Sequence, residues 1–322
     1  QSTANSHHMI KVPIFTEQIK SEANDGKCTI NGNDYRFEGK ILSGKANGFG
    51  KLFCAGGVIF SSNFKDGFLD DDEGRIEFDD KILFGEFKNG RLNGKSRVTA
   101  QQAQNEQQCV DIHGNFLNNL QVGLWQFSRG DEQFNYFFSD EGHLIKAQLK
   151  ASDYYEEGRF SNDQRSGQWF YVSSGTKATY TYQNDKKHGP FREQFENFTE
   201  FGQFQNGIKM SVVREFVSGR IEEGNVTNQE KSGLWTEIEN NVTSQGCYEN
   251  GVKCGKWMII KGSECEDKEE QWSGNFVNGL KSGEWVWKNN NKLYKCAFRR
   301  GKQINLWETE PEQIEDVFQT FL

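Results

Sequence analysis

Six cations at equivalent positions along the chain are the residues best spaced to bind an anionic partner. They are Arg165, Lys187, Lys209, Lys231, Lys253 and Lys281. Each cation stands two residues after the turn residue of a repeat, so the six side chains would form a row along one sheet edge, roughly 10 Å apart. That spacing is about one Debye length at physiological salt and would create a local basic field.

Two interpretations of this basic turn edge stay open. The row would suit an extended anionic partner, which is either an acidic protein segment or an anionic lipid surface. Alternatively, lysines beside a hairpin turn only keep the sheet edge soluble and discourage aggregation. The formal net charge of −8, from 38 Lys and Arg against 46 Asp and Glu, argues against nucleic acid as the partner.

Metal-binding and catalytic constellations are sparse in the sequence. Cys109, Asp111 and His113 alternate along a strand and would share one face, but a fourth ligand and the usual ligand spacing are missing. The acidic turn at 70–73 lacks the spacing of a calcium-binding EF-hand loop. No nucleophile, base and oxyanion site come together. We therefore expect that the protein is not an enzyme and binds no cofactor or metal. A ligand- or metal-binding accessory module is the remaining alternative.

The residues that position the six cations belong to a repeat. Its turn residue, most often Gly after Asn, occurs at Gly44, Gly67, Gly90, Asn119, Asp163, Asp185, Gly207, Gln229, Gly251, Gly279 and Gly301. From Asp163 to Gly251 this residue recurs in four successive steps of 22 residues, which is typical of repeat proteins. Since each repeat needs only its neighbours, one continuous repeat domain is expected.

Each repeat is predicted to be a β-hairpin. Gly and an aromatic residue alternate with other residues, which places both on the same face of a strand. Asn-Gly or Asn-Asp then opens a turn, and a second Gly four residues later is expected to close it. A large residue, usually Trp, follows two residues further on and begins the return strand.

The large residues of the return strands are predicted to form the core. Six of the eight tryptophans occupy this position: Trp125, Trp169, Trp235, Trp257, Trp285 and Trp307. Phe191 and Val213 are expected to substitute for Trp in two other units. Gly246 and Gly274 lie on the aromatic face, where the missing side chain leaves a recess for a neighbouring ring.

The predicted fold is all-β: an elongated single-layer ribbon of antiparallel β-hairpins, with a short C-terminal amphipathic helix. Residues 1–34 are expected to be an N-terminal arm, 35–307 the repeat domain and 308–322 the helix. The apolar residues of that helix recur at helical spacing. They are Ile314, Val317, Phe318, Phe321 and Leu322. The helix would either cap the last hairpin or dock into a partner, and capping is the favoured alternative because repeat ribbons need closed ends.

The repeat resembles the MORN family. Residues 35–50 and 84–95 are similar to its Tyr-x-Gly-x-aromatic-x-x-Gly-x-x-x-Gly-x-Gly frame. From about residue 110 onward the units resemble variant MORN-like repeats, in which Trp or another large residue replaces the last Gly. The resemblance implies antiparallel sheets that act as scaffolds in cytoskeletal, ciliary and membrane-associated assemblies, sometimes as homodimers. Phosphoinositide binding has also been proposed for the family.

These observations favour a non-catalytic structural protein that contacts other protein subunits of a large intracellular assembly. A peripheral membrane adaptor that binds anionic lipid through the basic turn edge is the alternative. The seven cysteines include no Cys-x-x-Cys pair, which favours a reducing interior. The resemblance points to a cytoplasmic, cytoskeletal or ciliary location, whereas a processed terminus at Gln1 would fit a mitochondrial one.

Overall fold

A computed structural model describes residues 11–22, 25–100, 111–262, 270–289 and 292–309. For residues 306–309 it describes the backbone but not the side chains. The chain divides into two compact units, residues 1–174 (unit 1) and 175–322 (unit 2). The described residues form β-strands joined by short turns, with one 3-10 turn, η2 (Ala55–Gly57), as the sole helical element among them. The prediction of an all-β chain of antiparallel hairpins is confirmed.

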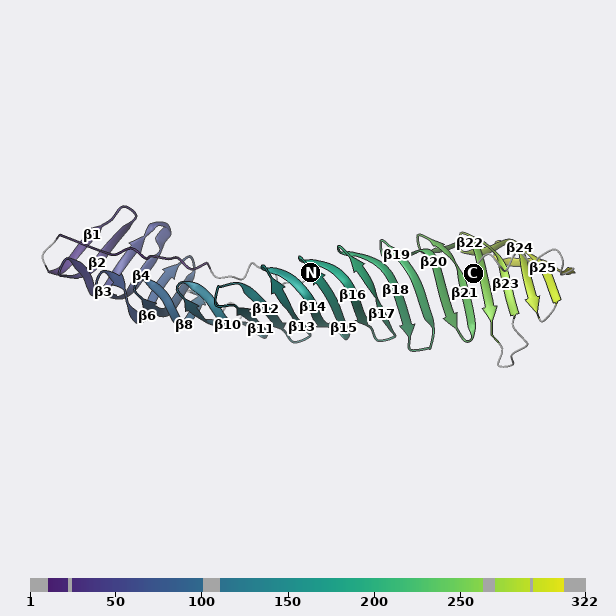
Figure 1. Ribbon diagram of the computed structural model, residues 1–322, viewed down its shortest axis with the longest axis horizontal. Helices are drawn as coiled ribbons and strands as arrows, with labels where there is room; N and C mark the ends of the chain where they lie inside the picture. Colours follow the sequence, from purple (N-terminus) through teal and green to yellow (C-terminus); the bar gives the residue numbers. More distant parts are fainter. Residues whose placement is uncertain (1–10, 23–24, 101–110, 263–269, 290–291, 310–322) are drawn as a thin grey trace. The chain divides into compact units, whose positions relative to one another are not determined.

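The described residues of unit 1 form fourteen strands that pair antiparallel with their neighbours in the chain (Figure 1). They are β1 (Gly26–Asn31), β2 (Tyr35–Leu42), β3 (Lys45–Cys54), β4 (Ile59–Lys65), β5 (Phe68–Leu69), β6 (Asp71–Phe78), β7 (Lys81–Lys88), β8 (Arg91–Ala100), β9 (Asp111–Leu117), β10 (Leu120–Arg129), β11 (Glu132–Phe138), β12 (Leu144–Lys150), β13 (Tyr154–Ser161) and β14 (Gln164–Ser173). The short strand β5 interrupts this order, so β4 pairs with both β5 and β6.

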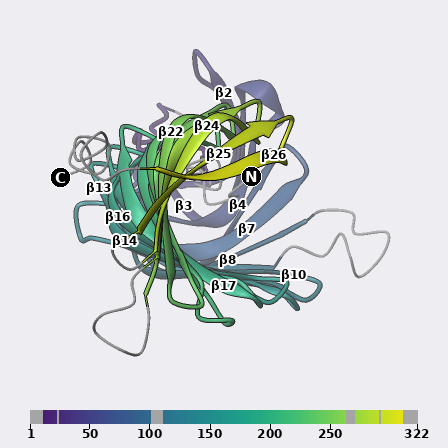
Figure 2. The same ribbon diagram turned by 90° about the vertical axis from the view of Figure 1, so that its right-hand side faces the viewer.

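In unit 2 the part of the chain that the structure describes forms twelve strands with the same antiparallel order, and several of them bend along their length (Figure 2). They are β15 (Thr176–Gln183), β16 (Lys186–Gln194), β17 (Phe198–Gln205), β18 (Ile208–Phe216), β19 (Ile221–Thr227), β20 (Glu230–Glu239), β21 (Val242–Glu249), β22 (Val252–Lys261), β23 (Glu270–Val277), β24 (Leu280–Asn289), β25 (Lys292–Arg299) and β26 (Lys302–Thr309).

The repeated turn residues occupy tight two-residue hairpin turns. At every one of the eleven positions, the turn residue and the residue before it both have positive φ, for example Asn250 at 49° and Gly251 at 77°. Positive φ at both central residues defines the type I′ turn, whose twist matches that of the flanking strands. Glu249 and Val252 therefore pair directly across the turn. Asn and Gly recur here because they adopt this backbone conformation at the lowest cost.

The second Gly of the repeat has a different role from the predicted one. It does not close the turn, because the return strand has already begun. In the β19–β20 hairpin, Asn225 pairs with Ser232 and Gly224 pairs with Trp235, so Gly233 and Leu234 have no counterpart in β19. These two residues form a β-bulge, and the positive φ of 71° at Gly233 is what the bulge requires of the backbone.

The bulge places each tryptophan of the repeat flat over the backbone of the preceding strand. Trp125, Trp169, Trp235, Trp257 and Trp285 are fully buried. In each case the ring covers a Gly eleven residues earlier, and the indole N–H donates to the carbonyl ten residues earlier. Trp235, for example, donates to the Asn225 carbonyl at 2.8 Å. The same bond joins the other four tryptophans to Asn115, Arg159, Cys247 and Asn275.

One unit without Trp differs from the sequence prediction. Phe191 is buried as the Trp equivalent and pairs with Gly202, but in the next unit the buried residue is Val212 and not Val213. Ser211 stands there in place of the second Gly, and the bulge contains only one extra residue, Met210. The shorter bulge shifts the strand by one residue, and a shift of one residue exchanges the two faces.

The predicted domain boundaries differ from the observed elements at both ends. The sheet begins before Tyr35, because β1 pairs along its whole length with β2. It continues past Trp307 to Thr309 in β26. The five apolar residues of the predicted C-terminal helix lie outside the described residues, so the structure does not support that helix. The side chain of Trp307 is also outside them.

Gly246→Ala tests the contact between glycine and tryptophan. A Cβ atom at Gly246 would lie 2.3 Å from the Trp257 ring, and the backbone there does not have positive φ, so the effect is steric. We expect a loss of about 1–3 kcal/mol in unfolding free energy, as for other overpacked cores, measured by urea denaturation. Gly262→Ala is the matched control, because its Cβ meets only the Asn241 carbonyl at 3.5 Å. Equal stability of the two variants would contradict the proposed packing.

Candidate functional site

The cations of the predicted basic edge lie on the core face of the sheet. Their equivalents in the first three units are Ala46, Leu69 and Leu92, and all three are almost completely buried. Arg165 is itself only 8% exposed. The lysines at this position in unit 2 are half-buried. The row therefore exists, but its side chains turn inward over the aromatic core and do not project from the edge.

In unit 2 the lysines cover the aromatic rings. The ammonium group of Lys231 lies 4.5 Å from the centre of the Trp235 ring, and that of Lys253 lies 3.9 Å from the Trp257 ring. Lys281 lies 4.3 Å from the Trp285 ring. Such cation–π contacts are attractive, and the aliphatic stems of the lysines shield the rings from water. Trp235, Trp257 and Trp285 are therefore each held between glycine backbone on one side and a lysine on the other.

Carboxylates of the same unit neutralise most of these cations. Glu237 accepts from Lys231 at 2.6 Å and from Lys253 at 2.8 Å. Glu222 lies 3.1 Å from Lys231. Lys209 contacts Glu193 at 3.2 Å and also bonds to Glu200. In unit 1, Arg165 lies 3.4 Å from Glu156. These residues therefore do not form the solvated basic field that the sequence predicted.

The ion-pair network shifts the pKa of its central carboxyl group. Burial alone would raise the pKa of Glu237, but hydrogen bonds from Lys231, Lys253 and Tyr248 outweigh burial and lower this pKa to about 2. The Tyr248 hydroxyl donates to Glu237 at 2.5 Å, and burial together with this carboxylate raises the pKa of Tyr248. Glu237 is thus held as a carboxylate, and its negative charge is part of the fold.

Lys281 differs from the other lysines of the row. Among the described residues no carboxylate lies within ion-pair distance of its ammonium group. The rings of Trp272 and Phe298 surround the ammonium, each at 5.2 Å, together with Trp285. Burial lowers the pKa of Lys281, and the nearby Lys253 lowers it further, against an opposing effect of Cys296. Lys281 is therefore a cation on the core face without a matching anion in the described chain.

The predicted N-terminal arm contains a feature that sequence reasoning missed. Residues 15–21 run across the turn edge of unit 1 and bond to its backbone. Ile19 is fully buried; its N–H donates to the Gly67 carbonyl at 2.8 Å, and its carbonyl accepts from Ala46 at 3.1 Å. Ser21 donates to the Gly44 carbonyl at 3.0 Å. The signal in the sequence was the group of apolar residues at 12, 14, 15 and 19 before the first repeat.

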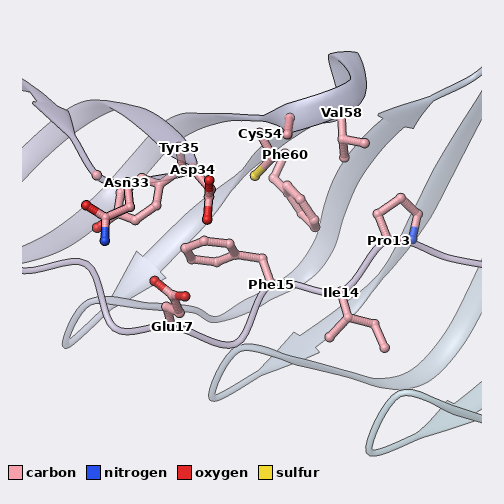
Figure 3. A pocket seen from close by; sticks show the side chains of 12 residues that line it. Pro13, Ile14, Phe15, Glu17, Asn33, Asp34, Tyr35, Cys54, Val58 and Phe60 are labelled. Atoms are coloured by element: carbon pink, nitrogen blue, oxygen red, sulfur yellow. The ribbon is translucent and has the colours of Figure 1, made fainter.

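A crevice of about 620 Å³ separates this segment from the neighbouring strands of unit 1 (Figure 3). Phe15 projects into it, with its ring 5.3 Å from Tyr35 and 6.2 Å from Phe60. Burial, with a smaller effect of Glu17, raises the pKa of both the Tyr35 hydroxyl and the Cys54 thiol. The ring contacts of Phe15 thus add to the backbone hydrogen bonds that hold residues 15–21.

The other sequence candidates have structural surroundings. Asp111 pairs with His113 at 2.8 Å and with Arg97 at 2.9 Å, whereas Cys109 lies outside the described residues. In the acidic turn, Asp71 accepts from the backbone N–H groups of Asn63 at 2.7 Å and Glu73 at 3.1 Å, which holds a local bulge. Across the described ranges, no group of three or more His, Cys, Asp or Glu residues could hold a metal ion.

The comparisons with known proteins add no assignment. No protein-family model matches the chain, and no curated protein matches it either. In the part of the chain that the structure describes, no helix is both long enough and apolar enough to cross a membrane.

Glu237→Gln tests the ion-pair network through its pH dependence. Because folding lowers the pKa of Glu237, its contribution is complete above the unfolded value near 4.5 and is lost as the pH falls toward 2. We expect the variant to lose about 3 kcal/mol of unfolding free energy at pH 7, and the difference from the parent protein to vanish toward pH 2. Urea denaturation between pH 7 and pH 2 measures this difference.

The matched control is Glu223→Gln, an exposed carboxyl on the neighbouring strand β19. It should leave the unfolding free energy nearly unchanged over the same pH range. A small loss of unfolding free energy in Glu237→Gln would show that the network contributes little to stability. A loss that does not change with pH would show that the charge of Glu237 does not cause it.

Proposed function

We propose that this protein is a non-catalytic β-hairpin repeat scaffold that holds other protein subunits in a larger assembly. The observation that carries the proposal is the seating of residues 15–21 on the turn edge of unit 1. The segment is bound through backbone groups of Gly44, Ala46 and Gly67, and the turns at Gly279 and Gly301 repeat the backbone bond that joins Gly67 to the hairpin before it. A surface of this kind suits extended peptide segments of other proteins.

Exposed apolar side chains near the turns of unit 2 also support protein contacts. Val277 is 55% exposed and Leu280 is 48% exposed, and the two residues pair across the β23–β24 turn. Ile208 and Leu234 are similarly exposed in earlier hairpins. These positions alternate with core residues such as Phe276 and Lys281, so they lie on the face opposite the tryptophans. Apolar residues gathered on one face are typical of interaction surfaces.

The resemblance to MORN repeats supports the same proposal, since that family supplies scaffolds of cytoskeletal and ciliary assemblies. On this basis we place the protein inside the cell. The lipid-binding alternative has less support, because the cations that would contact lipid cover the core and most of them are paired with carboxylates. The paired cations are Arg165, Lys209, Lys231 and Lys253.

Cross-linking mass spectrometry of the protein in its native source tests the scaffold proposal. We expect cross-links from the turn edges to a small, constant set of proteins. In size-exclusion chromatography we expect the native protein to elute at a mass well above the 37.0 kDa of one chain. Sedimentation with anionic vesicles, with neutral vesicles as the control, is the accompanying measurement. Elution as a single chain without cross-links, or sedimentation with anionic vesicles alone, would contradict the scaffold proposal.

A further inference from the structure

We propose that the turn edge of unit 2, from Gly251 to Gly301, binds an extended acidic peptide of a partner protein, with a carboxylate of that peptide on Lys281. This inference rests on the proposed scaffold function and specifies the partner chemistry of one surface. It follows from a comparison of equivalent backbone groups in the two units, each taken by itself.

Unit 1 supplies the template for the bound peptide. Ile19 bridges two consecutive hairpins, because it accepts from the Ala46 N–H and donates to the Gly67 carbonyl. The segment then continues to the next turn, where Thr16 lies against Gly90. Successive hairpins are roughly 10 Å apart, which an extended chain spans with about three residues. The observed steps from Ile19 to Thr16 follow this spacing.

Unit 2 repeats the backbone geometry of that edge. In unit 1 the Gly67 N–H donates to the Ala46 carbonyl at 2.9 Å, which joins one turn to the hairpin before it. The equivalent bonds in unit 2 run from Gly279 to Lys253 at 3.0 Å and from Gly301 to Lys281 at 2.9 Å. Within the described ranges, no residue of unit 2 bridges these turns as Ile19 bridges those of unit 1.

The side chains beside these turns define the chemistry of the occupant. Two residues after the turn residues of the two bridged hairpins, unit 1 has the apolar residues Ala46 and Leu69, and the residue that bridges the hairpins is the buried apolar Ile19. The equivalent residues in unit 2 are Lys253 and Lys281. Lys253 already contacts Glu237 at 2.8 Å, whereas Lys281 has no carboxylate among the described residues. An acidic side chain at the position of Ile19 would supply the missing charge.

A second donor lies on the same face of the sheet, further along β24 from Lys281. Trp272 lies 5.2 Å from the Lys281 ammonium, and its ring stacks on Trp287 at 4.9 Å. The indole N–H of Trp287 is buried and has no acceptor in the described chain. Trp287 also stacks on Tyr294, so the three rings form an apolar surface beside the cation. Cation, N–H donor and aromatic surface together favour a peptide with acidic and apolar residues.

Binding of synthetic peptides to the full chain tests the inference. The probe is a labelled peptide with the sequence of residues 11–22 carrying Ile19→Glu, and its control carries Ile19→Gln. Because a charged hydrogen bond replaces a neutral one, we expect the Glu peptide to bind about tenfold more tightly or better in fluorescence anisotropy. A photoreactive group in place of Phe15 should cross-link the Glu peptide to residues 251–301.

Protein variants localise the effect. Lys281→Met should abolish the preference for Glu over Gln, whereas Lys302→Met, at an exposed cation beside the next turn of the same edge, should preserve it. Equal affinity of the two peptides, cross-links confined to unit 1, or a preference that survives Lys281→Met would overturn the inference. The peptide comparison alone decides the matter if the variant does not fold. The inference would also be overturned if a variant that ends at Thr309 bound the Glu peptide tenfold more tightly than the full chain does. That result would assign the site to the C-terminal residues of the chain itself.

Failure of this inference and failure of the scaffold function have different outcomes. Native partners that cross-link elsewhere, with no preference for the Glu peptide, would leave the scaffold function standing and remove the acidic peptide site. A clear preference for the Glu peptide, with no partner cross-linked in the native source, would show the reverse.

Discussion

The structure depends on covering both faces of aromatic rings in a sheet that, among the described residues, has no second layer to pack against. A tryptophan on such a sheet would leave one face in water. Here glycine lets the ring lie on the backbone, as Trp257 does on Gly246, and a lysine covers the other face. The bulge leaves a carbonyl to which the indole N–H donates, so burial of the ring leaves no polar atom without a partner.

The first three hairpin repeats and those of unit 2 complete this cover in different ways at the same position. The first three place Ala46, Leu69 and Leu92 there, with Ile19 of the N-terminal segment buried at the same edge. Unit 2 places lysines there and pairs them with carboxylates such as Glu237, whose charge the network holds down to low pH. The proposed acidic-peptide site lies where the second arrangement is incomplete, at Lys281.

Much of the fold could be predicted from the sequence, because the local signals agree with one another. The turn residues, the glycines and the large return-strand residues each specify the same hairpin. The direction of the cations was mistaken, because the turn has only two residues, so that Lys253 already pairs with Tyr248 on the core face. Ala46 and Leu69 at the same position carried the missing information. The prediction that Val213 is a core residue was wrong because Ser211 at the bulge changes the length of the bulge. That change is not evident from the spacing of the repeat. The packing of Ile19 joins residues far apart in sequence, which no local pattern predicts.

Hydrogen exchange of the indole N–H groups, followed by NMR, tests the central claim most directly. The account predicts that Trp125, Trp169, Trp235, Trp257 and Trp285 exchange slowly, because each N–H is buried and bonded to a strand carbonyl. Assignment by single Trp→Phe changes identifies each signal. Exchange of these five indoles as fast as in the unfolded chain would contradict the account.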